Sequence, residues 1–315
     1  MPTQTQNGKA LEFAFLKSLE KTLSNQTNVM VINSPQLRTT QTNYLSLPQE
    51  TQQRMSAGAD AGINTIIQLE PRLIKGNGSL QLSIQPDSAG QAGDVRDVIG
   101  VRSTEGWEIG ISCKNNHAAL KHSRLSATID IGDSWFGYNS TRDYFNQVIP
   151  IFDELNNMRT KGMAWSQIPD KVDSYYVPVL NALIEELWRL DRIYPGQIPQ
   201  RLLTYLLGRF DFYKAIVKTR SRTTEIQGFN LQGTLNQGAN GVRPTLRMPH
   251  LRLPSRFYDI HFKPGSDNTI LIVCDEGWTI SARVHNASSR VEPSLKLDVQ
   301  LVGLPPTIFR QTLGW

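Results

Sequence analysis

The chain has 315 residues, of which 39% are hydrophobic and 19% charged, and its formal net charge is +5. This length can bury one large core or two modest ones, and the composition excludes a wholly disordered or collagen-like chain. No apolar run approaches the roughly 20 residues of a membrane-spanning helix. The N-terminus has no secretory signal pattern, so we expect a cytoplasmic protein without a membrane partner.

The two cysteines, Cys113 and Cys274, each lie in an alternating apolar run. We therefore expect buried thiols in preference to a disulfide. No Cys/His spacing of the finger type occurs, so a structural zinc site is not expected.

Positive charge is concentrated in residues 201–256, which hold ten Lys or Arg against Asp211 and Glu225. This excess of eight is larger than the net charge of the whole chain, so the remainder is net acidic. Such asymmetry is typical of a surface that follows nucleic-acid phosphates. A solvated basic face without a ligand is the alternative.

The first predicted element is a helix over residues 8–23, because Leu11, Phe15 and Leu19 recur at spacings of four. Glu12 lies on the apolar stripe of this helix. A polar segment at 24–42 precedes a second predicted helix over 48–69. Alternation then predicts a strand over 79–85.

A loop at 85–93 leads into two strands, predicted over 97–102 and 107–114, whose connection has hairpin length and ends in Gly106. In the second strand, the odd-numbered residues from Trp107 to Cys113 face one way. The even-numbered residues from Glu108 to Lys114 face the other way.

Beyond the hairpin the pattern becomes helical and then returns to strands. Helices are predicted over 142–161, 174–190 and 199–207, and strands over 268–274, 278–285 and 294–302. These shifts suggest a core at 1–135, a helical region at 136–210 and a basic, strand-rich region at 211–315. One integrated domain is the alternative.

Asp97 and Lys114 are expected to meet at one end of the hairpin. Aspartate is disfavoured in strands, and here it opens one strand beside the end of its partner. A lysine ending a buried strand is costly without an anionic partner, unless it reaches solvent. Glu12 adds a second inward-facing carboxylate, and such oxygens suit Mg²⁺.

Phosphodiester hydrolysis uses such a set of groups. A hard cation polarises the phosphoryl oxygen and activates water, and a lysine orients that water or helps to deprotonate it. Spacing alone does not single out this chemistry.

The order of Glu12, a strand with Asp97 and a strand ending in Lys114 resembles the PD-(D/E)xK nuclease superfamily. More narrowly, four stretches resemble the HaeIII type II restriction endonuclease family. They are GKALEF at 8–13, GDVRDV at 93–98, WEIGISCKNNHAALKHSRLS at 107–126 and HNASSRVEPSLKLDVQLVG at 285–303.

This resemblance implies an α/β fold of the restriction-endonuclease type: a mixed β-sheet core flanked by helices, with further helical and β elements for DNA recognition and dimerisation. It also implies a Mg²⁺-dependent type II restriction endonuclease that cuts double-stranded DNA at the palindrome GGCC. A homodimer is implied as well, because a two-fold protein matches a two-fold site.

The resemblance also assigns residues. It implies that Asp97 is a metal ligand, Lys114 the catalytic lysine and Glu12 an accessory acid that also faces the metal. The second acid of the motif is Ser112 here, which leaves the number of metal ions open. Asp94 is a candidate to compensate as a ligand.

The polar stretch after Lys114 offers side chains that commonly contact DNA phosphates, with a solvated loop as the alternative. Other Arg and Asn side chains are candidates for reading base edges. The predicted phosphate contacts are Asn115, Asn116, His117, Lys121 and Arg124, and the predicted base contacts are Arg220, Arg222, Arg283 and Asn286.

Two other functions compete with this hypothesis. One is a repair or recombination nuclease that recognises DNA structure instead of sequence. The other is a non-catalytic DNA-binding protein in which Asp97, Lys114 and Glu12 form a structural ion network, an alternative that Ser112 favours.

Overall fold

The computed structural model describes residues 3–91, 93–116 and 119–315, which divide into two compact units. Unit 1 combines residues up to 118 with 209–251 and 307–315, and unit 2 combines 119–208 with 252–306. The units are discontinuous in sequence because strands far apart in the chain pair within one sheet. The regions predicted at 1–135, 136–210 and 211–315 have other bounds and remain a prediction.

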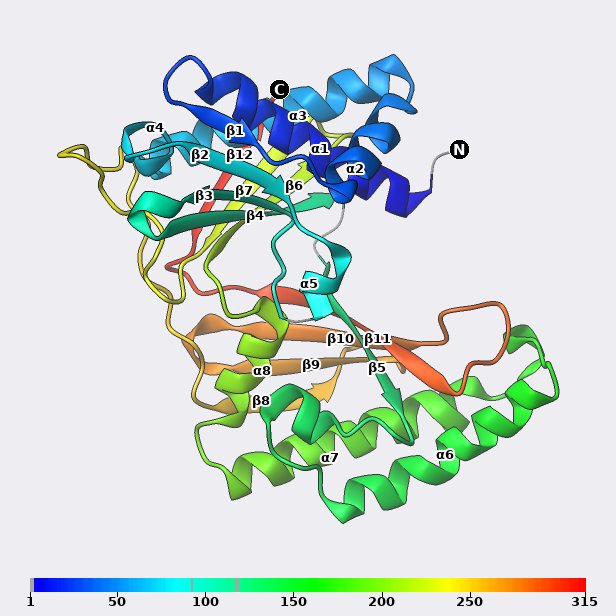
Figure 1. Ribbon diagram of the computed structural model, residues 1–315. Coiled ribbons are helices and arrows are strands. Elements are labelled where there is room, and N and C mark those ends of the chain that lie inside the picture. The colour runs from blue at the N-terminus through cyan, green and yellow to red at the C-terminus, as the bar shows by residue number, and fades with distance from the viewer. Residues whose placement is uncertain (1–2, 92, 117–118) are drawn as a thin grey trace. The chain divides into compact units, whose positions relative to one another are not determined.

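In the described part of the chain, unit 1 contains a seven-stranded mixed sheet (Figure 1). Its strands β1 and β2 run parallel, as do β4 and β6, and the other neighbours are antiparallel. In spatial order the strands are β1 (Val29–Val31), β2 (Leu80–Ile84), β3 (Val98–Arg102), β4 (Trp107–Asn115), β6 (Phe212–Lys218), β7 (Thr223–Phe229) and β12 (Phe309–Gly314).

Two long helices of unit 1, α1 (Gln4–Leu23) and α3 (Gln49–Leu69), pack against the sheet. Thr3 begins α1 with a capping box in which its hydroxyl and the side chain of Gln6 each accept the other's backbone N–H. The shorter helices are α2 (Pro35–Leu45), α4 (Arg72–Lys75) and α5 (Asp87–Gln91).

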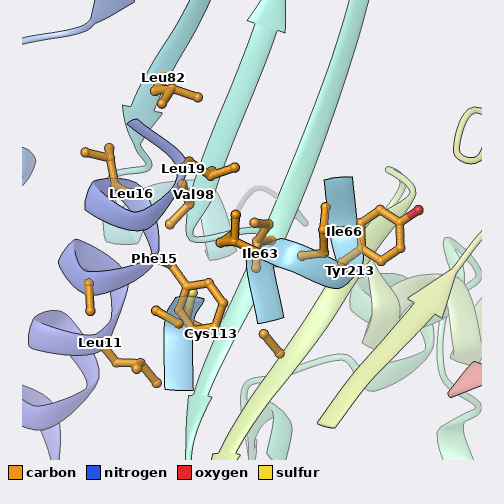
Figure 2. Close-up of a cluster of buried hydrophobic side chains, with 14 of the residues drawn as sticks. Leu11, Phe15, Leu16, Leu19, Ile63, Ile66, Leu82, Val98, Cys113 and Tyr213 are labelled. Atoms are coloured by element: carbon orange, nitrogen blue, oxygen red, sulfur yellow. The ribbon is translucent and has the colours of Figure 1, made fainter. Parts of the chain in front are cut away.

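The core of unit 1 lies between these helices and the sheet (Figure 2). One cluster of buried side chains includes Leu11 and Phe15 of α1, Ile63 of α3 and Cys113 of β4. The stripe that predicted the first helix therefore forms the core, and Glu12 on that stripe is buried too.

The predicted hairpin is confirmed as β3 and β4, joined by a tight turn at Ser103–Glu105. Gly106 ends this turn at φ 58°, a left-handed conformation that glycine adopts without a Cβ penalty. Val98 pairs with Ile111 across the hairpin. This register places the start of β3 beside the end of β4.

Unit 2 contains, among the described residues, a five-stranded antiparallel sheet. Helix α6 packs on β5 and β11 and also on α7, and α8 packs on β5. In spatial order the strands are β5 (Ala119–Ser126), β11 (Ser294–Gly303), β10 (Thr279–His285), β9 (Thr269–Cys274) and β8 (Phe257–Phe262), and the helices are α6 (Arg142–Thr160), α7 (Val177–Ile193) and α8 (Ile198–Leu207).

The α/β class is confirmed, and each predicted helix and strand exists with bounds shifted by a few residues. The polar segment 24–42 contains β1 and the start of α2, which its composition did not predict. Cys113 and Cys274 are free buried thiols, as expected. None of the described helices is long and apolar enough to cross a membrane.

Candidate active site

Asp97 and Lys114 converge at the open end of the β3–β4 hairpin. Lys114 Nζ lies 3.8 Å from Asp97 Oδ2. The same oxygen accepts a hydrogen bond from the backbone N–H of Cys113 at 2.7 Å and one from the hydroxyl of Ser112 at 3.4 Å. The convergence predicted from the hairpin is therefore confirmed, and β4 itself orients the aspartate.

Glu12 brings a second carboxylate to this site from α1. It is only 7% exposed, and burial together with the negative charge of Asp97 raises the pKa of Glu12 well above its usual range. Lys9, whose Nζ lies 3.1 Å from Glu12, opposes this shift. The same Nζ lies 2.5 Å from Asp87. A buried acid beside a partly exposed acid that repels it is suited to a shared cation.

The donor set fits a hard divalent cation held by few protein ligands. Among the described residues, no three His, Cys, Asp or Glu side chains gather into a metal-binding group. Mg²⁺ is commonly held by one or two carboxylates plus waters and substrate phosphates. Asp97 and Glu12 supply such a pair, and Ser112 adds a hydroxyl where the motif has an acid.

Asp94 is engaged in a different cluster. Its two oxygens accept hydrogen bonds from Arg96 at 2.8 Å each, and Gln85 donates a further bond at 2.6 Å. Burial acts to raise the pKa of Asp94, but the bonds and charge of Arg96 lower it overall. These contacts weigh against Asp94 as a metal ligand, and that role stays a prediction.

The Arg96 side chain lies across the sheet on the face opposite α1. It reaches Glu108 at 2.9 Å and stacks 3.9 Å from the ring centroid of Phe210. This path passes over Gly110, where an added Cβ would lie 2.0 Å from Arg96 Cδ. Glycine at 110 therefore leaves the room that the buried guanidinium needs.

Asn115 and Asn116 lie at the end of β4, and Asn116 contacts the turn between β6 and β7. Asn116, at φ 60°, accepts hydrogen bonds at Oδ1 from the backbone and hydroxyl of Thr219. Arg220 and Arg222 are exposed on this same turn. Four predicted DNA contacts thus lie at the Lys114 end of the sheet.

The remaining predicted DNA contacts either belong to unit 2 or lie outside the part of the chain that the structure describes. Arg124 donates to Glu292 at 2.6 Å, and Arg283 to Asp298 at 3.2 Å. The buried Asn286 holds its own loop by donating to the carbonyls of Ser288 and Arg290. His117 lies outside the described residues, as does the side chain of Lys121.

Sequence reasoning missed Lys9 and Lys214. Lys9 stands in the same short stretch as Glu12, and its spacing of three on a helix was the available signal. Lys214 interrupts the apolar run of β6 and is 2% exposed. A lysine inside an apolar run was a signal of a functional residue too. The residues that lie beside Lys214, however, are set by the pairing of β6 with β4, which the sequence does not show.

An α/β core in which a hairpin joins an aspartate to a lysine, beside an acid from the first helix, is the arrangement expected of a restriction endonuclease. The family model described as HaeIII restriction endonuclease matches residues 8–305. The chain is 40% identical over 309 residues to the type II restriction enzyme HaeIII of Haemophilus aegyptius. The aligned residues cover 98% of this chain and 97% of that protein. The chain therefore belongs to the HaeIII restriction endonuclease family. No solved structure is significantly similar to it.

Proposed function

We propose that the chain is a Mg²⁺-dependent type II restriction enzyme that hydrolyses double-stranded DNA at GGCC. The observation that carries the proposal is the 3.8 Å approach of Lys114 Nζ to Asp97 Oδ2 in a member of this family. The name of the 40% identical relative supports the reaction class. The four-base target is what the family resemblance implies.

Asp97 and Glu12 would hold the metal ion. When bound, Mg²⁺ would polarise a phosphoryl oxygen and lower the pKa of the attacking water. The backbone N–H of Cys113 and the Ser112 hydroxyl keep the Asp97 carboxylate in place. Lys9 lowers the pKa of Glu12, but burial and the charge of Asp97 still keep this pKa above its usual range, and a bound cation would favour the ionised carboxylate.

Lys114 would act on the phosphate and the water. Its side chain is 18% exposed, so the ammonium can reach a DNA backbone while Asp97 orients it. A positive charge there stabilises the negative charge that develops on the phosphate oxygens. Asn116 and the turn with Arg220 and Arg222 would position the flanking phosphates.

Assembly as a homodimer is part of the proposal, because GGCC has two-fold symmetry. Two identical active sites related by a two-fold axis would reach the two strands equivalently. Sedimentation of the protein with a GGCC duplex in Ca²⁺ tests this, and one chain per duplex contradicts it.

Digestion of a plasmid of known sequence, with Mg²⁺ and separately with EDTA, tests the function. Discrete fragments ending at GGCC with Mg²⁺, and none with EDTA, are expected. A smear or simple nicking would instead favour a structure-specific nuclease. Specific binding without any cutting would favour a non-catalytic DNA-binding protein.

The variant Asp97→Ala separates binding from cutting. It should lose Mg²⁺-dependent cleavage and keep most of its affinity for the GGCC duplex, since it removes a ligand of the metal and no DNA contact. The exposed Asp267→Ala is the matched control and should cut normally. Undiminished cutting by Asp97→Ala refutes the proposed site.

A further inference from the structure

Lys214 lies beside the candidate active site, in the middle of β6. Strand β6 is parallel to β4, and Lys214 is the cross-strand partner of Ser112. Tyr213 and Ala215 belong to the hydrophobic cluster that also contains Cys113. Because side chains alternate along strands, Lys214 lies on the opposite face, with Ser112 and Lys114.

Burial disfavours the ammonium form of Lys214. Lys214 is 2% exposed, and burial together with the charge of Lys114 lowers the pKa of Lys214 to about 7, against an opposing effect of Glu225. Glu225 itself accepts hydrogen bonds from Lys218 and from Arg310. Phe212 and Ile216, on the same face of β6, are buried too. A buried lysine with a lowered pKa, on the sheet face that carries Ser112 and Lys114, is a candidate for a functional role.

Ser112 suggests what that function is. An acid at position 112 would lie directly across from Lys214 and would help to hold a second cation, as in two-metal sites. A serine hydroxyl carries no charge and cannot do this. Beside Ser112, the neighbouring strand β6 instead carries the amine of Lys214, whose positive charge comes from a side chain and not from a metal ion.

We propose that the ammonium form of Lys214, beside Ser112 in the sheet, stabilises the scissile phosphate in place of a second metal ion. The inference rests on the proposed nuclease function. An arriving phosphate favours the ammonium form of the lysine. The same charge repels a second divalent cation, so the site takes one metal ion per chain.

The first test measures metal binding without DNA. Mn²⁺ is titrated into the full-length protein by calorimetry at pH 6.5, where the ammonium form of Lys214 prevails. The natural protein should bind one Mn²⁺ per chain, and Lys214→Met should bind Mn²⁺ about tenfold more tightly because a repulsive charge is gone. Lys214→Arg keeps the charge and should bind like the natural protein.

The second test measures single-turnover cleavage of a GGCC duplex at saturating Mg²⁺. Lys214→Met should cut about 100-fold more slowly, and Lys214→Arg should recover most of the rate. Lys263→Met is the control, since Lys263 is exposed and lies outside the basic segment 201–256. It should stay within about twofold of the natural protein in both tests.

The inference is overturned if Lys214→Met cuts at the natural rate, or if it binds Mn²⁺ no more tightly. Far-UV circular dichroism first establishes that each variant is folded. If Lys214→Met does not fold, the uncharged Lys214→Gln replaces it with the same two expectations. Failure of the natural protein to cut GGCC DNA would instead remove the proposed function, and the Mn²⁺ titration would still report on the charge at position 214.

Discussion

The ammonium of Lys114 lies 3.8 Å from Oδ2 of Asp97 at the open end of the β3–β4 hairpin. Seventeen positions separate the two residues in the sequence, and the hairpin register brings them back together. Neither charge is deeply buried, since 18% and 25% of the two side chains remain exposed. The pair is therefore open to a substrate and contributes little to stability.

Replacing Lys114 should affect the reaction far more than the fold. We expect Lys114→Met to slow single-turnover cleavage of a GGCC duplex by about 10²- to 10⁴-fold, because a group that moves or orients a proton is lost. The melting temperature should change little. The exposed Lys161→Met serves as the control, and equal cleavage rates for the two variants would remove Lys114 from the site.

The turn between β6 and β7 should contact DNA through its arginines. We expect Arg220→Gln and Arg222→Gln each to weaken binding of a GGCC duplex in Ca²⁺ and to flatten the slope of log affinity against log salt by about 0.9. Fluorescence anisotropy over a range of salt concentrations measures both. The exposed Arg159→Gln in α6 is the control, and an unchanged slope in the turn variants would argue against phosphate contact.

Gly110 should be intolerant of a side chain because Arg96 passes over it. A Cβ at this position would lie 2.0 Å from Arg96 Cδ, so Gly110→Ala should displace the guanidinium from Asp94 and Glu108. We expect a loss of about 1–3 kcal/mol in the free energy of unfolding, measured by urea denaturation. Gly8→Ala is the control, because nothing lies within 4 Å of a Cβ there. A Gly110→Ala variant as stable as the Gly8→Ala control would contradict this packing.

Glu70 should make the stability of the protein depend on pH. Its Oε1 accepts from the hydroxyl of Tyr213 at 2.6 Å and the backbone of Asn236 at 2.7 Å. Its Oε2 is buried without a hydrogen-bond partner in the part of the chain that the structure describes. Burial raises the pKa of Glu70 to about 7, although the bonds from Tyr213 and Asn236 oppose the shift.

The sign of the effect follows from this raised pKa. A group that holds its proton more tightly in the folded state contributes stability below its unfolded pKa, and that stability is lost as pH rises through the folded value near 7. We expect the free energy of unfolding of Glu70→Gln, measured with urea, to rise relative to that of the natural protein by up to about 3 kcal/mol as the pH is raised from 5 to 8. In the control Glu50→Gln, which changes an exposed residue, the free energy of unfolding should depend on pH as it does in the natural protein. If Glu70→Gln also shows the pH dependence of the natural protein, the Glu70 carboxyl stays ionised in the folded state.

Local patterns in the sequence determined several parts of this protein. The stripe of Leu11 and Phe15 predicted α1 and placed Glu12 on its buried side, because a helix repeats every 3.6 residues. Alternation from Trp107 to Cys113 predicted β4, and a short connection made β3 its antiparallel neighbour. Asp97 and Lys114 could therefore be brought together by reasoning over a few residues.

Tertiary structure alone decided the remainder. The pairing of β4 with β6 spans about a hundred residues, so no local pattern could place Lys214 across from Ser112. The polar stretch with Arg124 became strand β5 because it pairs with β11 from the far end of the chain. Local periodicity reports which face of an element is buried, but only packing decides which distant element covers it. The position of Lys214 beside Ser112 could therefore be identified only from the three-dimensional structure.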